Sequence, residues 1–241
     1  MAEYTYHLDP RRSQEIQLSA YQDNRRLLRP IAGITYTKLA GSRTEQAEAA
    51  AQFMSRFLDG NDLVVFAKAL VEDLDWYEGD ANRFEAAIRE LGALLGFGSQ
   101  RPEVEIGRGP DNLWALGGLR FLVIESKNGA TTPVISKHDC NQLLGSIEWF
   151  KHAYDKTCTP LPVIIHPSNR FDHQASPSAD CRVIDETRLA KLKANLNQYA
   201  SAIATSGKMS DPAFIRDRLQ AFGFASGDFV DSFTRKPSKD R

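Results

Sequence analysis

Three side chains between residues 109 and 128 have types and spacing suited to chemistry on phosphate esters. Asp111 opens one apolar run, and Glu125 and Lys127 close the next one. A carboxylate and an ammonium group buried at the end of an apolar strand are costly unless each has a partner. A divalent cation would pair with the carboxylates, and a phosphate would pair with the ammonium group. The pattern therefore indicates a metal-assisted reaction at a phosphate.

The two apolar runs flank Gly117-Gly118, which predicts a β-hairpin. An extended strand places Glu125 and Lys127 on one face. A strict two-residue turn at the glycines would set Asp111 opposite Ile124, on the wrong face. A three-residue loop or a bulge instead sets Asp111 opposite Glu125, because a shift of one residue exchanges the two faces. The sequence therefore predicts a three-residue turn or a bulge.

The motifs in this hairpin resemble those of the PD-(D/E)XK nuclease superfamily, which has the restriction-endonuclease-like fold. Pro110-Asp111 matches the first part of the signature and residues 125–127 match the second. Residues 84–97 resemble the first helix of that family, residues 139–144 the helix that supplies a glutamine, and residues 162–168 a further strand. The resemblance covers roughly residues 84–200. More narrowly, the segment looks like nuclease domains found with helicase-type ATPases in prokaryotic defence and repair proteins.

The resemblance implies a role for each residue of the site. Asp111 and Glu125 would bind Mg²⁺ or Mn²⁺ together with the backbone carbonyl of Ser126, and Lys127 would orient the attacking water and hold a phosphate oxygen. The alternative for these side chains is a surface ion pair at a strand end. Two helical residues complete the expected catalytic set. Glu85 would be a second metal ligand, or alternatively an acid that caps its helix. Gln142 would orient water or phosphate, with Asn141 as a competitor for this role, or alternatively is an exposed helix residue.

Five further residues are candidates for contact with nucleic acid. Lys137 and His138 fall in the first turn of a helix, where backbone amides can receive a phosphate. His166 and Ser168 follow an apolar strand, and Arg108 precedes the hairpin. The competing interpretation is a solvated basic face for the cations and a structural role for the strand-end histidine.

Composition bounds the class of protein. The chain has 241 residues, of which 42% are hydrophobic and 25% charged, with a net charge of −1. These values are ordinary for a soluble globular protein. Three cysteines without metal-ligand spacing, no signal peptide and no apolar run long enough for a membrane span predict a reduced, cytoplasmic protein. A P-loop motif is missing from the given residues, so an ATPase that takes part would be on another chain or in a region outside this sequence.

The sequence predicts an α/β fold: a restriction-endonuclease-like core, with a mixed central sheet flanked by helices, and a helical N-terminal region. We expect residues 1–80 to form that N-terminal region, 81–205 the nuclease core, and 206–241 a C-terminal helix and flexible tail. Residues 1–30 are expected to be extended or irregular. Apolar periodicity and capping residues predict helices at 47–58, 63–74, 80–95, 136–154, 185–203 and 211–222, and strands at 104–106, 161–166 and 182–184.

Three functional hypotheses follow. The first is a Mg²⁺- or Mn²⁺-dependent DNA endonuclease, with a role in defence against foreign DNA, a helicase or ATPase partner, and homodimerisation for cutting both strands. The second is a non-catalytic nucleic-acid-binding or scaffold subunit on a nuclease-like fold, which the near-neutral charge motivates. The third is a metal hydrolase that acts on small phosphate esters. Retention of Asp111, Glu125 and Lys127 favours the first.

Overall fold

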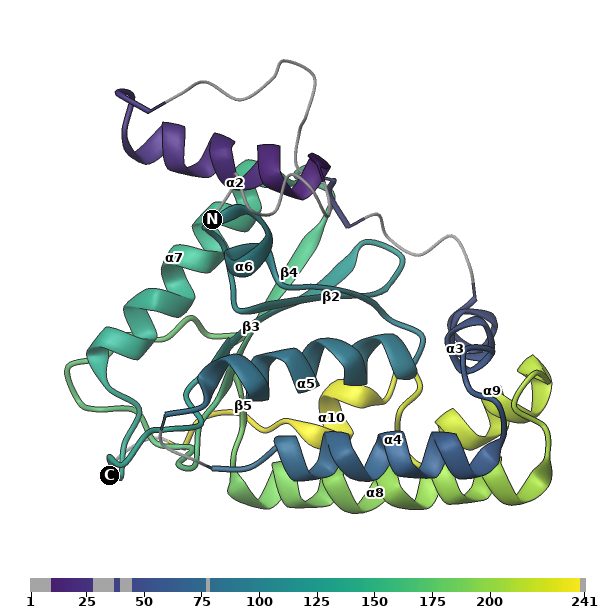
Figure 1. The fold of residues 1–241 in the computed structure, drawn as a ribbon. Coiled ribbons are helices and arrows are strands. Elements are labelled where there is room, and N and C mark those ends of the chain that lie inside the picture. The colour runs from purple at the N-terminus through teal and green to yellow at the C-terminus, as the bar shows by residue number, and fades with distance from the viewer. Residues whose placement is uncertain (1–9, 28–36, 40–44, 77–78, 239–241) are drawn as a thin grey trace.

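A computed structural model describes residues 10–27, 37–39, 45–76 and 79–238 of the chain. Its centre is a five-stranded sheet between layers of helices (Figure 1). The strands lie in chain order, as β1 (Gly98–Gln100), β2 (Asn112–Gly117), β3 (Arg120–Ser126), β4 (Thr159–Ile165) and β5 (Arg182–Ile184). Neighbours among β1, β2 and β3 are antiparallel, whereas β3, β4 and β5 are parallel. The predicted α/β class with a mixed central sheet is confirmed.

The helices follow the capping signals of the sequence. The side chains of Asp59, Asp80, Ser136, Asp185 and Asp211 each accept a hydrogen bond from a backbone N–H in the first turn of the helix that follows. The described helices are α2 (Pro10–Asp23), α3 (Gln46–Met54), α4 (Gly60–Asp73), α5 (Ala81–Leu94), α6 (Pro102–Ile106), α7 (Lys137–Ala153), α8 (Glu186–Ser206), α9 (Pro212–Ala221) and α10 (Phe229–Phe233). All six predicted helices are present, with ends shifted by a few residues.

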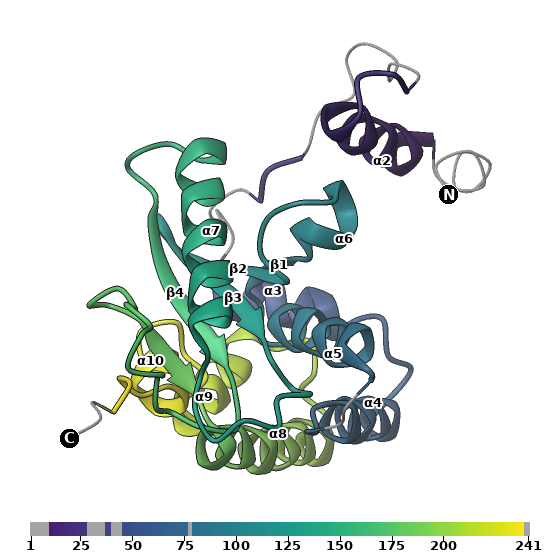
Figure 2. The same cartoon turned by 90° about the vertical axis from the view of Figure 1, so that its left-hand side faces the viewer.

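Strand β3 shows how the sheet separates two cores. Leu122 and Ile124 point to the face that α5 and α8 cover, whereas Phe121 and Val123 point to the face that α7 covers. Figure 2 shows α7 on one side of the sheet and α5 on the other. Because side chains alternate along a strand, Glu125 continues the row that faces α7. The hydrophobic pattern thus determines which helix meets the carboxylate.

The helices before and after the central sheet pack together. Helix α4 lies beside α8 (Figure 1), and Leu63 and Leu70 of α4 belong to the same buried cluster as Leu196 and Ile203 of α8. The three segments expected from the sequence therefore share one hydrophobic core. Within residues 1–30, the described part corrects the expectation of extended structure, because Pro10–Asp23 is helical; residues 1–9 and 28–30 lie outside the described residues.

The segment before the hairpin also differs from the prediction. The expected strand at 104–106 is wrong, since these residues end helix α6, and the first strand is Gly98–Gln100. Pro102 in the first turn and Gly107, with a φ of 75°, bound this short helix. The alternation of Val104, Glu105 and Ile106 resembled a strand, but these boundary residues determine the local structure.

The C-terminal segment is more ordered than expected. Arg235 forms an antiparallel bridge with Val183 of β5, and Ser238 forms a parallel bridge with Arg170. The expectation of a flexible tail is therefore wrong for residues 234–238, and residues 239–241 lie outside the described residues. Arg235 thus pairs with the outer side of β5, which is the edge strand of the five-stranded sheet.

Candidate active site

A bulge in the β2–β3 hairpin aligns the two carboxyl groups. Ala115 pairs with Phe121, but the next pair is Gly117 with Arg120, so β2 carries one extra residue. Continuing the register from the pair Asn112–Ile124 by one residue places Asp111 opposite Glu125. The prediction of a bulge is confirmed, whereas the alternative three-residue loop is wrong: the turn comprises two residues, Gly118 and Leu119. Positive φ angles at both glycines permit this path.

Glu125 is nearly inaccessible to solvent and has two side-chain partners. Its side chain accepts a hydrogen bond of 2.6 Å from Ser146 Oγ on α7, and Lys127 Nζ lies 3.4 Å from its other oxygen. Only 5% of the residue is exposed. Burial and the nearby Asp111 carboxyl raise the pKa of Glu125 to about 7. Ser146 was not anticipated, although it lies four residues after Gln142 on the same helical face.

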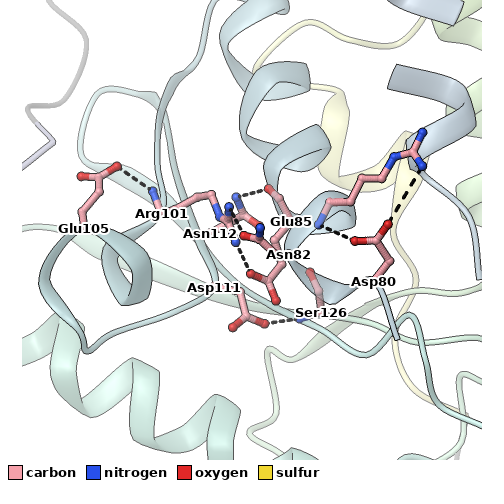
Figure 3. Close-up of polar contacts among 9 residues, drawn as sticks. Asp80, Asn82, Glu85, Arg101, Glu105, Asp111, Asn112 and Ser126 are labelled. Atoms are coloured by element: carbon pink, nitrogen blue, oxygen red, sulfur yellow. Dashed lines mark hydrogen bonds and ion pairs between the residues drawn. The ribbon is translucent and has the colours of Figure 1, made fainter. Parts of the chain in front are cut away.

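Asp111 is held by the opposite strand. One of its carboxyl oxygens accepts a hydrogen bond of 2.7 Å from the backbone N–H of Ser126 (Figure 3). Its exposed fraction is 6%, so both strand-end acids are buried. Asp111, Glu125 and Lys127 thus converge at one end of the hairpin, as the spacing of the residues requires.

Glu85 lies on α5 beside these groups but already has a charged partner. Figure 3 shows the Arg101 guanidinium paired with Glu85 and donating to Asn82 Oδ1, at 3.0 Å in the latter case. Asn112 donates to the backbone carbonyl of Glu85 at 3.0 Å. Burial, followed by repulsion from Asp111, raises the pKa of Glu85, and Arg101 acts in the opposite direction. Arg101 is itself buried, so it does not belong to a solvated basic face.

Glu103 of α6 is a fourth carboxyl at the site and was missed from the sequence. Its side chain lines the same pocket as Asp111 and Glu125. Hydrogen bonding to the nearby Asp111 carboxyl, followed by burial and repulsion from Asp111, raises the pKa of Glu103 to about 7. Its signal was hidden because residues 104–106 resembled a strand.

The four carboxyl groups and the Lys127 ammonium group line one pocket of about 870 Å³. The α7 residues Asp139, Gln142, Gly145, Ser146 and Trp149 form one wall, since their spacing puts them on one side of the helix. Of the predicted site residues, the pocket brings together seven: Glu85, Arg108, Asp111, Glu125, Ser126, Lys127 and Gln142. The loop at residues 128–132 forms another part of the wall.

Four predicted nucleic-acid contacts lie outside this lining. Lys137 and His138 are exposed on the first turn of α7, and Ser168 is partly buried. His166 is fully buried, and its Nδ1 accepts a hydrogen bond of 2.9 Å from the Ser168 backbone N–H. The expectation that His166 faces a groove for DNA is therefore corrected, because it is a core residue. Burial lowers the pKa of this imidazole.

The residues fit a hard divalent cation. Carboxylate and carbonyl oxygens are the ligands that Mg²⁺ and Mn²⁺ prefer, and Asp111, Glu125 and the Ser126 carbonyl supply them. The raised pKa of Glu125 results partly from repulsion by Asp111, which a cation between them would relieve. In the described part of the chain, no three His, Cys, Asp or Glu side chains form a ready-made metal centre.

Comparison with known protein families, with curated proteins and with solved structures finds no match. Among the described residues, no helix is both long and apolar enough to cross a membrane.

Proposed function

We propose that this chain is a metal-dependent nuclease that hydrolyses phosphodiester bonds in DNA. The observation that carries the proposal is the convergence of Asp111, Glu125 and Lys127 on one pocket, which the bulged register brings about. Two acids and a lysine at the end of a hairpin provide ligands for a cation and a donor for phosphate. Glu85 and Gln142, the two helical members of the expected catalytic set, line the same pocket.

The order of elements supports a restriction-endonuclease-like core. Helix α5 precedes the hairpin β2–β3, helix α7 follows it, and strand β4 then pairs in parallel with β3. This is the order helix, hairpin, helix, strand that the family resemblance implies. Fold likeness alone would not identify the reaction, so the proposal depends on the site.

The chemistry divides among the residues as follows. Asp111, Glu125 and the Ser126 carbonyl would hold Mg²⁺ or Mn²⁺, which when bound neutralises charge on the phosphate and lowers the pKa of water. The Ser146 hydroxyl holds Glu125 in place through its 2.6 Å hydrogen bond. Lys127 Nζ, 3.4 Å from Glu125, would donate to a phosphate oxygen and orient the attacking water. Gln142 offers an amide to the same water or phosphate.

The same proposal extends, through the family resemblance, to endonucleolytic action, a helicase or ATPase partner, and a role in defence against foreign DNA. A homodimer would place two such sites on opposite DNA strands. Each of these extensions depends on the first claim, that the pocket hydrolyses DNA.

The test is cleavage of supercoiled plasmid and of linear single- and double-stranded DNA with Mg²⁺, Mn²⁺ or EDTA. We expect metal-dependent nicking or linearisation that is lost in Glu125→Ala. The matched control is Glu148→Ala, which removes an exposed carboxylate from α7 outside the pocket lining.

Full cleavage by Glu125→Ala would reject the site. Wild-type protein that binds DNA but cuts no form of it with either metal would favour the non-catalytic subunit. A parallel assay with a small phosphodiester covers the third hypothesis, which cleavage of that ester without cleavage of DNA would favour.

A further inference from the structure

Two acidic side chains near Asp111 come from two different helices, and they differ in their partners. Glu85 comes from α5 and forms an ion pair with Arg101, whose side chain is 9% exposed. Glu103 comes from α6, and its carboxyl lies near that of Asp111. Both line the pocket. The two positions therefore compete for the role of third acid at the site.

The Arg101 pair makes Glu85 a poor ligand for a cation. A guanidinium cannot be deprotonated in a protein, so it stays positively charged beside Glu85. It is also anchored, because it donates to Asn82 and its backbone N–H donates to Glu105 at 3.1 Å. A divalent cation on Glu85 would lie next to this fixed positive charge, and moving Glu85 away would leave Arg101 buried without its carboxylate.

Glu103 has none of these constraints. Among the described residues, none forms an ion pair with its carboxylate. Its backbone is nevertheless fixed to the site, since the Glu103 N–H donates to the Pro110 carbonyl at 3.3 Å, directly before Asp111. Gly109, with a φ of 102°, lets this segment approach Pro102 and Trp149 closely. The Glu103 carboxyl thus lies near Asp111 without a cationic partner among the described residues, and its backbone is held at the site.

We propose that Glu103, and not Glu85, supplies the third carboxylate to the cation at Asp111 and Glu125. Glu85 is then the partly buried partner of Arg101 and a positioning residue that joins α5 to the start of α6. This inference depends on the proposed metal site. It replaces the helical acid that the sequence pattern suggested with one from the short helix between β1 and β2.

The experiment is isothermal titration of the full chain with Mn²⁺, with thermal unfolding measured on each protein. We expect Glu103→Gln to weaken Mn²⁺ binding roughly tenfold or more, because the charge of the ligands sets affinity for hard cations. Glu105→Gln is the matched control, since it changes a carboxylate on the same helix outside the pocket lining. It should bind Mn²⁺ like the wild type.

Glu85→Gln should lower the melting temperature by several degrees and leave Mn²⁺ affinity within about threefold. Where that variant does not fold, the double variant Glu85→Gln/Arg101→Gln removes the buried charge together with its partner, and its Mn²⁺ affinity decides in the same way. Wild-type binding by Glu103→Gln, or an equal loss in a folded variant at Glu85, would overturn the inference. Wild-type binding by Glu125→Ala would instead overturn the proposed metal site.

Discussion

Acids buried at the ends of two strands of the same sheet differ in what surrounds them. Glu125 ends β3 and is 5% exposed, and Asp185 follows β5 and is 6% exposed. One oxygen of Asp185 accepts a hydrogen bond of 3.0 Å from the Arg188 backbone N–H, and the other lies 3.1 Å from Arg235 Nε. Glu125 instead lies beside the Asp111 carboxyl, and both residues line the pocket.

The comparison separates a structural acid from a candidate catalytic one. Asp185 has a helix N-terminus and an arginine as partners, so its charge is neutralised within the fold. At Glu125, burial and then repulsion from Asp111 raise the pKa, and the Ser146 hydroxyl and the Lys127 ammonium offset these effects only in part. Burial of an acid at a strand end is therefore not diagnostic. A second acid beside it, at a pocket that both acids line, is the informative feature.

The largest effect that would sharpen this contrast is on Lys127. Lys127→Ala should lower the cleavage rate by about 10²–10⁴-fold, the range for loss of a group that transfers or positions protons. Mn²⁺ affinity should change only a few-fold, because a cation is removed and not a ligand. Single-turnover rates and Mn²⁺ titration check the two parts separately. A parallel loss in both measurements would assign Lys127 a structural role.

The next effect is a pH dependence of stability. The pKa of Glu125 is raised from 4.5 to about 7, so the folded state binds a proton more tightly than the unfolded chain. Its stabilisation is present below pH 4.5 and is lost as pH rises through about 7. In EDTA at pH 8, the free energy of unfolding of Glu125→Gln should therefore exceed that of the wild type by roughly 1–3 kcal/mol. The variant should accordingly unfold at a higher temperature.

His166 contributes with the opposite sign. Its pKa is lowered by burial, so its stabilisation is lost as pH falls below about 6.5. Wild type and Glu125→Gln share this contribution, and the difference between them isolates Glu125, which Asp111, Lys127 and Ser146 face. Mn²⁺ at pH 8 should stabilise wild type alone. Identical melting curves from pH 5 to 8 would contradict the assigned environment of Glu125.

The smallest effect concerns access to the pocket. A side chain built at Gly145 meets no atom within 4 Å of its Cβ, so this position on α7 leaves space in the pocket wall. Gly145→Leu should keep Mn²⁺ affinity and gain up to about 1 kcal/mol of helix stability, while slowing DNA cleavage roughly tenfold. Gly145→Ala is the control and should cleave almost normally. Unchanged cleavage by the leucine variant would mean that DNA does not enter beside α7.

Most of the architecture could be predicted because its signals are local. The apolar run before Glu125, next to Gly117-Gly118, located β3, and the capping side chains of Ser136 and Asp185 located α7 and α8. The bulge followed from the requirement that Asp111 and Glu125 share a face. Helix α6 was missed because Val104-Glu105-Ile106 alternates like a strand, although Pro102 and Gly107 mark helix boundaries.

The part of the site that could not be predicted depends on tertiary contacts. Glu103 meets Asp111 only because α6 folds back on the Pro110 carbonyl. The pairing of Glu85 with Arg101 joins residues on two different elements, and nothing in their spacing indicates it. Its position after a strand left His166 open to a DNA contact or a structural role, and its full burial and its hydrogen bond from the Ser168 backbone N–H decide for the structural role. Local patterns identify residue types, whereas the partner of each side chain is decided by packing.

The most direct test of the central claim compares the pocket acid Asp111 with the structural acid Asp185 in one assay. Asp111→Asn and Asp185→Asn are measured side by side for Mn²⁺-dependent cleavage of supercoiled plasmid, with folding checked by thermal unfolding. We predict that Asp111→Asn lowers cleavage by roughly a hundredfold to a thousandfold without loss of stability, since it removes a metal ligand. Asp185→Asn should lose stability and, while folded, cleave like wild type. Equal cleavage by folded Asp111→Asn and wild type would contradict the account.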